Sequence, residues 1–217
     1  MDGLEKFPFY NDLTPQEKQA YAGKVRRRSF GRGEAVHRGD CAGLIYIESG
    51  RLRVYTLSEE GREFTLYRLC DGDVCLLSAS CALSNLSFDV FVTAETDCAL
   101  FILSAGEYKE LSARSLAVAQ YTNALMAERF SRAMWVLGEV MGKKFGARLA
   151  ALLLQERGFA GGNELKLTHE QLAGHLGCMR EAVSRTLKYF EEEGLVSLFR
   201  GGIRIENVAG LRELAGE

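Results

Sequence analysis

A run of charged and hydroxyl side chains between residues 180 and 188 carries the clearest chemistry in the sequence. Arg180 and Arg185 can each form two hydrogen bonds with the O6 and N7 atoms of a guanine. Glu181 can accept a hydrogen bond from cytosine N4, and Ser184 can contact a base edge or a phosphate. An i, i+3, i+4, i+7 spacing places four residues on one helical face: Glu181, Ser184, Arg185 and Lys188. The segment therefore predicts a helix that reads base edges in DNA.

The residues around this segment predict a helix-turn-helix. Thr168 followed by Gln171 has the spacing of a capping box that starts a helix, and Gly177 ends that helix after about two turns. The second helix then starts within residues 178–181 and continues to about residue 190. The face opposite its polar residues is expected to be core: Val183, Leu187 and Phe190.

A glycine-rich turn follows the second helix. Arg200-Gly201-Gly202 separates the short apolar runs 196–199 and 203–205, which predicts a hairpin, with a further short strand at 165–167. A helix-turn-helix followed by such a hairpin is a winged helix, whose second helix enters the DNA major groove. Arg200 and Arg204 add positive charge on the wing. We assign DNA contacts to seven residues: Thr168, Arg180, Glu181, Ser184, Arg185, Lys188 and Arg200. The alternative is a solvated face of salt-bridged charges.

The first half of the chain predicts strands. Glycines recur about every ten residues, a spacing typical of an all-β barrel or sandwich. The β-rich runs between them are 44–47, 52–55, 64–67 and 88–92, and residues 58–61 have the composition of a hairpin turn. One helix start precedes the strands, with Thr14 as N-cap, Pro15 at the first helical position and Glu17 at the third.

The pattern changes at residue 104. Residues 104–137 contain one glycine, no proline and many strong helix formers, which predicts one long helix. An apolar seam indicates pairing of this helix with a second copy of the chain: Leu111, Val118, Tyr121 and Leu125. The alternative is that the seam packs on its own β domain. Gly138 and Gly142 lower the cost of a bend and mark a boundary and hinge. The predicted domains are 1–103, 104–141 (the helix and hinge) and 142–217 (the winged helix-turn-helix).

Composition excludes several classes of protein. The net charge of −2 over 217 residues excludes a histone-like polycation but leaves room for a local basic surface. No apolar run approaches the roughly 18 residues of a membrane span, and the first residues show no signal-peptide pattern. We therefore expect a cytoplasmic protein with no membrane association, whose six cysteines are reduced thiols.

The stretch from Leu167 to Leu187, LTHEQLAGHLGCMREAVSRTL, resembles the DNA-reading unit of the cyclic-AMP receptor protein / fumarate-nitrate regulator (CRP/FNR) family. The glycine-spaced strands from Gly50 to Gly72 resemble the β-roll sensor of that family. The resemblance covers nearly all of the chain. It implies an α+β fold with an N-terminal cyclic-nucleotide-binding-like β-roll (jelly roll), a long dimerisation helix and a C-terminal winged helix-turn-helix.

The same resemblance implies a bacterial transcription regulator. It would be a homodimer on a palindromic operator in double-stranded DNA, with RNA polymerase as a further partner. The triplet Glu181, Ser184 and Arg185 is similar to the branch that reads TTGA-type half-sites, and Arg180 to the branch that reads TGTGA. The sequence does not decide between the TTGA-type and the TGTGA-type half-site.

The sensor region departs from the cyclic-nucleotide-binding members of the family. Gly72-Asp73 stands where they carry a Gly-Glu pair, and no arginine lies between Arg68 and Arg114 to neutralise a cyclic phosphate. Because a buried phosphate without a cationic partner is costly, the sequence argues against cyclic AMP as the effector.

Residues 75–81, with a cysteine at each end, support three interpretations. In the first, the thiols are small core residues. In the second, they line a pocket for a small organic or weakly polar effector. In the third, they do redox or iron chemistry through a Cys75–Cys81 disulfide or an iron–sulfur cluster. The cysteine spacings match no cluster motif. Haem occurs in the family, but His37 is the only histidine of the first half. The candidate effector residues are Gly72, Asp73, Cys75, Cys81, Ser84 and Asn85.

Two other classes of protein were weighed against a DNA-binding regulator. A cupin-like metal enzyme would need several converging His and Glu ligands, which the one histidine of the first half does not supply. No nucleophile–base arrangement is visible either, so we assign no catalytic and no metal-binding residues. A non-DNA adaptor that uses the winged helix for protein contacts would not need Arg180 and Arg185.

Overall fold

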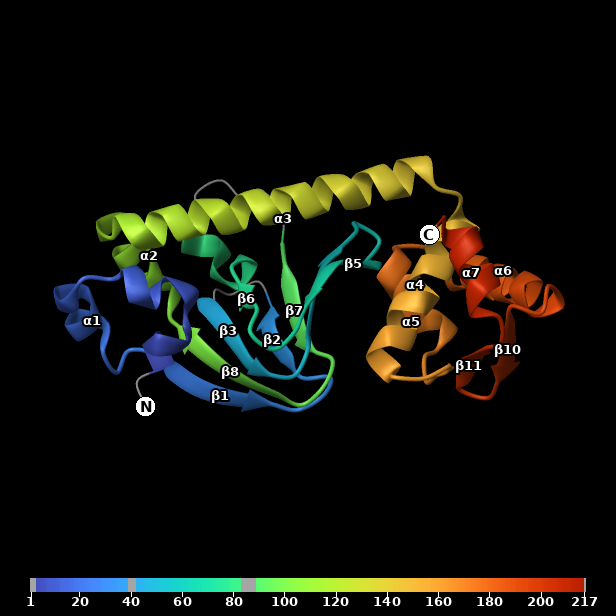
Figure 1. The fold of residues 1–217 in the computed structure, drawn as a ribbon, viewed down its shortest axis with the longest axis horizontal. Helices are drawn as coiled ribbons and strands as arrows, with labels where there is room; N and C mark the ends of the chain where they lie inside the picture. Colours follow the sequence, from blue (N-terminus) through green and yellow to red (C-terminus); the bar gives the residue numbers. More distant parts are fainter. Residues whose placement is uncertain (1–2, 39–41, 83–88, 217) are drawn as a thin grey trace. The chain divides into compact units, whose positions relative to one another are not determined.

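The computed structural model describes residues 3–38, 42–82 and 89–216 (Figure 1). The chain forms two compact units. Unit 1 comprises residues 1–57 and 66–133, and unit 2 comprises residues 58–65 and 134–217. The division falls inside the longest helix, α3 (Leu116–Gly142).

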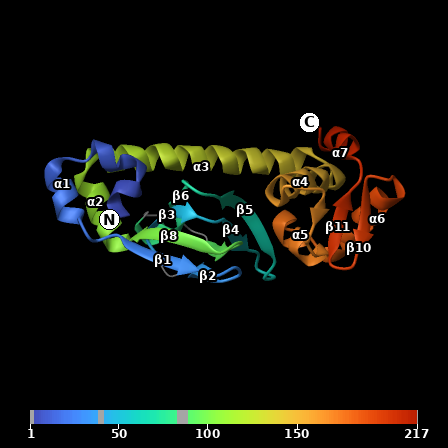
Figure 2. The same cartoon turned by 60° about the horizontal axis from the view of Figure 1, so that its bottom comes forward.

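Unit 1 is built on two four-stranded antiparallel sheets. One has the order β1 (Arg26–Phe30), β8 (Cys98–Leu103), β3 (Leu44–Ser49) and β6 (Val74–Cys75). The other has the order β2 (Ala35–Arg38), β7 (Phe91–Ala94), β4 (Leu52–Leu57) and β5 (Glu63–Leu69). Figure 2 shows β1, β8 and β3 lying side by side. The predicted β-roll is confirmed, although its Phe88 lies outside the described residues.

Alternating side chains of the two sheets form the core of the roll. In β3 and β4 the inward residues, including Ile45, Ile47 and Val54, are fully buried. They pack with Val92 and Leu100 in a single cluster. The turn between β3 and β4 requires a glycine, because Gly50 has a φ of 99° and any Cβ there would meet the backbone of residues 97 and 98.

Helices close one end of unit 1. Two 3-10 turns, η1 (Gly3–Lys6) and η2 (Pro8–Asp12), precede α1 (Pro15–Tyr21), whose predicted Thr14–Glu17 capping box is confirmed. A third 3-10 segment, η3 (Leu77–Ala82), follows β6. The helix α2 (Ala105–Arg114) and the first part of α3 complete the unit.

The predicted helix over 104–137 is two helices with a break at Ser115. Ser115 has extended backbone angles, φ −100° and ψ 115°. Its N–H donates to the Leu111 carbonyl, and its own carbonyl accepts from Ala119 N at 3.0 Å. Ser115 thus ends α2 and starts α3. It is only 3% exposed, because this corner packs inside unit 1. The second helix is longer than predicted, since it runs through Gly138 and ends at Gly142.

The apolar seam of these helices packs on its own β domain. Leu111 and Val118 are fully buried and Leu125 is 7% exposed, in a cluster with Val74 and Phe101. The Tyr121 ring lies 5.4 Å from that of Phe9 in an edge contact. These contacts favour the alternative that the seam packs on its own β domain, although Tyr121 is only partly buried. The break at Ser115 places Leu111 on α2 and the other three residues on α3, and residues of the 3-10 turns and of the β-roll cover them.

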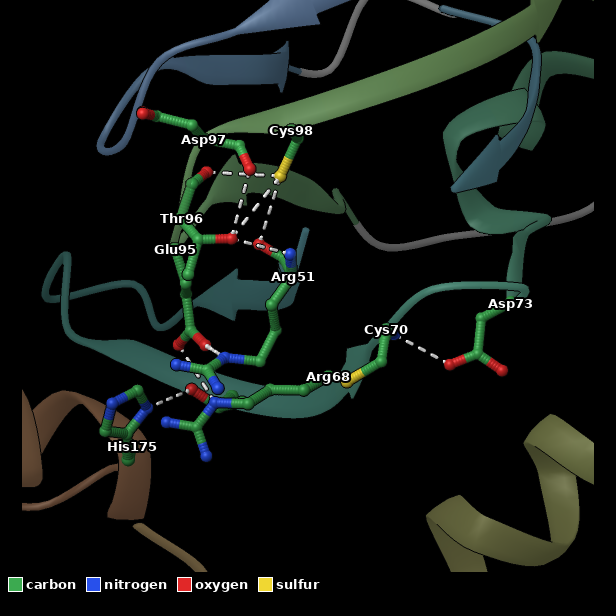
Figure 3. Close-up of polar contacts among 10 residues, drawn as sticks. Arg51, Arg68, Cys70, Asp73, Glu95, Thr96, Asp97, Cys98 and His175 are labelled. Atoms are coloured by element: carbon green, nitrogen blue, oxygen red, sulfur yellow. Dashed lines mark hydrogen bonds and ion pairs between the residues drawn. The ribbon is translucent and has the colours of Figure 1, made fainter. Parts of the chain in front are cut away.

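A partly buried ion-pair network links three neighbouring strands of unit 1's second sheet, β7, β4 and β5. Glu95 lies between two arginines (Figure 3), accepting from Arg51 Nε at 2.7 Å and from Arg68 Nε at 2.9 Å. The side chains of Arg68 and Glu95 are 5% and 15% exposed. Removing the carboxylate would leave two guanidinium groups without their shared counter-charge in a poorly hydrated place.

Unit 2 is a small α+β domain. Its elements are α4 (Phe145–Ala160), β9 (Glu164–Leu165), α5 (His169–Leu176), α6 (Arg180–Glu192), β10 (Val196–Phe199), β11 (Gly202–Ile205) and α7 (Val208–Ala215). The strands form one antiparallel sheet in the order β10-β11-β9. Helix α7, which the sequence analysis did not predict, is capped by Asn207 and contributes Leu211 to the core.

We predict that Glu95→Gln lowers the free energy of unfolding by about 2–3 kcal/mol, because it removes the carboxylate that both arginines share in a poorly hydrated place. The matched control is Glu48→Gln, whose partner Arg27 is 56% exposed and whose loss should cost about 0–1 kcal/mol. Urea unfolding followed by far-ultraviolet circular dichroism measures both values. Equal destabilisation by the two variants would contradict a structural role for the network.

Candidate nucleic-acid interface

Helix α5 begins and ends as its sequence predicts. Thr168 Oγ1 accepts from Gln171 N at 3.2 Å, and Gln171 Oε1 accepts from Thr168 N at 2.9 Å, which completes the capping box. At the other end Gly177 takes a left-handed conformation with a φ of 65°. The N–H of Cys178 then donates to the Ala173 carbonyl at 3.1 Å. This closed turn sets the direction in which α6 leaves α5.

Helix α6 has one buried face and one exposed face. Val183, Leu187 and Phe190 are fully buried in the core of unit 2, as predicted. On the opposite face Ser184 is half-buried and three charged residues are exposed: Glu181, Arg185 and Lys188. Arg180 is exposed at the first position of the helix. Within the described ranges, no acidic side chain forms an ion pair with the three basic residues. The alternative of a salt-bridged face therefore finds no support, since the positive charge is left for a partner.

A hydrogen-bonded chain fixes Ser184 against the start of α5. Ser184 Oγ donates to the Arg180 carbonyl at 3.0 Å. Because a hydroxyl has one proton, the 2.8 Å contact with His169 Nδ1 requires that nitrogen to be the donor. The Ser184 hydroxyl therefore has no proton left to donate to a partner. Its oxygen can only accept one further hydrogen bond, through its remaining lone pair. Burial, with a smaller contribution from the Arg180 charge, lowers the pKa of His169.

The wing brings a separate part of the sequence to the same face. An open cleft of about 440 Å³ is lined by Thr168, His169, Arg180, Phe199 and Gly201, among others. Arg200 is exposed at the tip, beside Gly201 with its φ of 85°. The structure thus brings together Thr168, Arg180 and the wing tip, while Arg185 and Lys188 follow farther along α6.

One expected charge on the wing is neutralised. Arg204 Nη2 lies 2.5 Å from Glu164 Oε1 across the β9–β11 pair. The sequence analysis counted Arg204 as free positive charge, and this count is wrong because the strand pairing places Glu164 opposite it. A second carboxylate is also used internally, since Glu191 Oε1 accepts from the Leu198 backbone N–H at 2.9 Å and ties α6 to the wing.

The structure describes only some of the candidate effector residues of unit 1. Gly72 lies in an exposed turn with a φ of 87°, and Asp73 Oδ2 accepts from Cys70 N at 2.8 Å (Figure 3). Both residues therefore hold the turn before β6. Cys75 is fully buried on β6. Cys81 lies in η3, but nothing is described of its side chain, and Ser84 and Asn85 lie outside the described residues.

The described thiols have the character of core and turn residues. Burial raises the pKa of the Cys75 thiol, and the pKa of Cys70 is raised by burial and then by Asp73. Cys98 Sγ donates to the Thr96 carbonyl at 3.1 Å. A raised pKa disfavours the thiolate, which is the reactive form. In the ranges that the structure covers, no three His, Cys, Asp or Glu residues converge as metal ligands.

The sequence analysis missed one buried cation. Arg129 of α3 is 7% exposed and lies in unit 1 beside β5 and β6. A signal for it was present, since Arg129 follows Val118 and Leu125 by eleven and four residues and so continues their apolar stripe. An arginine at such a position has to reach into the β domain.

A two-sheet β-roll and a winged helix-turn-helix, whose exposed basic residues pair with no carboxylate in the described part of the chain, define a DNA-binding regulator. The chain is 46% identical to a solved structure from Eubacterium rectale assigned to the CRP/FNR family of transcriptional regulators, covering 98% of this chain and 100% of that one, with a TM-score of 0.95. The chain therefore belongs to the CRP/FNR family.

Other comparisons agree with that assignment. The Crp-like helix-turn-helix domain matches residues 147–214, and the cyclic nucleotide-binding domain matches residues 27–115. The cyclic AMP receptor protein of Thermus thermophilus is 29% identical over 96% of both chains. A CRP/FNR-family regulator of the same organism, solved as a crystal structure, is 25% identical with a TM-score of 0.68, over 88% of this chain and 99% of that one. In the described residues no helix is long and apolar enough to cross a membrane.

We predict a pH dependence of stability from His169. The pKa of His169 is lowered on folding from its ordinary value of 6.5, so the unfolded chain binds this proton more readily. The neutral form of His169 therefore contributes its full share to the free energy of unfolding above pH 6.5. This contribution is lost as the pH falls toward the pKa of His169 in the folded protein. Between pH 7.5 and 5.5 the urea midpoint should drop more for the parent than for His169→Gln. An equal drop in both proteins would contradict this role.

Proposed function

We propose that this protein is a bacterial, sequence-specific transcription regulator that acts as a homodimer on a palindromic operator. Its β-roll would sense a small effector or a redox signal and control that binding. The observation that carries the proposal is the exposure of Arg185 and Lys188 opposite the fully buried face of α6, with Arg180 exposed at its first position and none of the three paired with a carboxylate among the described residues. Such an arrangement suits major-groove readout, with Arg200 and Thr168 near the backbone. We expect the protein to act in the cytoplasm and to contact RNA polymerase, as an activator or a repressor.

Support for a homodimer comes from the exposed side of α3. Phe130, Met134 and Leu137 are 67%, 49% and 48% exposed, and Leu116, fourteen residues before Phe130, is 73% exposed. This spacing fits a coiled-coil seam, which a second copy of the same helix would cover. We propose this stripe as the dimer contact in place of the buried seam.

We propose an effector other than cyclic AMP, although the Thermus thermophilus relative is named for it. The last arginine before the cysteine segment is Arg68, and its guanidinium is already paired with Glu95 at 2.9 Å. Asp73, at the position of the family's Gly-Glu pair, holds its own turn. These contacts support the argument from the sequence that the turn at Gly72 and Asp73, where the cyclic-nucleotide-binding members carry their Gly-Glu pair, does not hold a cyclic phosphate in their way.

We predict that Arg185→Ala weakens binding to the cognate palindrome by about 1–3 kcal/mol and relaxes specificity at one base pair. The operator is first selected from a random DNA library, which also decides between TTGA-type and TGTGA-type half-sites. Arg212→Ala, which removes an exposed positive charge on α7, is the matched control and should bind almost as the parent does. Gel-shift titrations in which Arg185→Ala and the parent bind equally would refute the assignment.

We further predict that Phe130→Asp converts the dimer to monomer, because it places a charge in the apolar stripe of α3. Sedimentation velocity measures the oligomeric state, and operator affinity should fall in parallel. Ser131→Asp puts the same charge at the next exposed position and should remain dimeric. A dimeric Phe130→Asp protein would rule out this face as the contact.

A further inference from the structure

The buried guanidinium of Arg129 is poorly compensated within unit 1. Its Nη2 donates to the Val74 carbonyl at 3.3 Å. Its Nη1 lies 3.5 Å from Glu128 Oε1, but that carboxylate is half-exposed and closer to Arg132, at 2.9 Å. Its Nε is buried and has no hydrogen-bond partner among the residues that the structure describes. A charge taken out of water normally has a full set of partners.

A second unpartnered group stands beside it. The Arg129 guanidinium carbon lies 4.9 Å from the ring centroid of Tyr67 on β5. The Tyr67 hydroxyl is buried and, within the described part of the chain, also lacks a hydrogen-bond partner. Burial holds the pKa of Tyr67 well above its usual value, so this hydroxyl is neutral and able to donate. Two donors in one place are thus left without acceptors.

Packing alone does not explain Arg129. The residue occupies the stripe of α3 in which Val118 and Leu125 are apolar and buried, and a leucine there would fill the same kind of space without desolvating a charge. The neighbouring Arg132 is 53% exposed and keeps its charge in water. A buried cation and a buried phenol without acceptors are typical of a site that receives a ligand.

We propose that Arg129 and Tyr67 form the recognition end of the effector site in unit 1 and bind an oxyanion, the carboxylate or phosphate group of a small molecule. This proposal rests on the proposed regulatory function and gives the effector its chemical class. One oxygen would accept from Arg129 Nε and another from the Tyr67 hydroxyl, while the guanidinium neutralises the charge. A cationic effector is excluded by the same guanidinium, and a neutral one would leave its charge uncompensated.

The position of Arg129 also connects this site with the proposed dimer contact. Arg129 and Phe130 are adjacent on α3, one buried in unit 1 and the other 67% exposed. An anion that fixes the Arg129 side chain therefore acts on the helix segment that carries the exposed stripe. Binding would favour one arrangement of that helix only if the anion has different affinities for the two arrangements.

The test is the thermal unfolding of the full-length protein at constant ionic strength. Sodium chloride is the reference, and the probes are acetate, inorganic phosphate and cyclic AMP, which separate a carboxylate, a phosphate and a cyclic phosphodiester. At a concentration about tenfold above Kd, a bound probe should raise Tm of the parent by about 3–5 °C. Salts also stabilise proteins without binding, so the quantity compared is the shift of the parent minus that of Arg129→Gln.

Three variants make the result specific. Arg129→Gln should lose the saturable part of the shift, and Arg132→Gln, with the same charge change at an exposed position of α3, should keep it. Tyr67→Phe should weaken the shift while leaving Tm in chloride equal to or above that of the parent, because it removes an unpartnered hydroxyl. If Arg129→Gln does not fold, the comparison of the Tm shift in Tyr67→Phe with that of the parent tests the proposal.

Three outcomes would overturn the proposal. They are the absence of a saturable shift with every probe, an unchanged shift in Arg129→Gln, and a lower Tm of Tyr67→Phe in chloride, which would show that its hydroxyl has a structural partner. DNA selection on the same preparations separates this from the proposed function. A protein that enriches an operator but fails the anion test refutes the effector site alone, and one that enriches no sequence refutes the regulatory function itself.

Discussion

The burial of one face of α6 is the constraint on which the DNA-binding unit depends. Val183, Leu187 and Phe190 are held in a core shared with α4, α7 and the small sheet. Once that face is fixed, the 3.6-residue period determines that Arg185 and Lys188 point to the surface, while Arg180 is exposed as the first residue of the helix. Within the described residues these charges form no ion pair, while two other carboxylates of unit 2 are used internally, Glu164 with Arg204 and Glu191 with the Leu198 backbone. The capping box and the Gly177 turn then set where this face begins.

Helix α3 has two apolar stripes that lie in different environments. One stripe, with Val118 and Leu125, is covered by the β-roll, and the other, with Phe130 and Leu137, is exposed. A heptad spacing in the sequence therefore has two physical explanations, and only the covering strands distinguish them. Arg129 stands on the covered stripe, where a guanidinium needs a counter-charge that the described residues supply only in part. The helix thus links the interior of the β-roll to the surface proposed for a second copy.

Local signals in the sequence were sufficient where local chemistry decides the structure. The Thr168–Gln171 cap, the left-handed Gly177 and the hairpin around Gly201 are all interactions within a few residues, and each was predictable. The break at Ser115, the Arg204–Glu164 pair and the buried Arg129 each depend on partners far away in the chain, or on which surface a helix meets. Residue spacing contains that information neither for the break nor for the ion pair, and for Arg129 it shows the apolar stripe but not what covers it. The effector residues were the least predictable, because the family pattern is absent at Gly72 and Asp73.

The central claim is that α6 reads DNA as one of a symmetric pair. Hydroxyl-radical and methylation-protection footprinting on an operator selected from random DNA tests it most directly. The account predicts two protected major-groove segments related by a dyad and separated by about one helical turn, near 34 Å. Protection of a single, non-palindromic segment, or protection confined to the minor groove, would contradict it.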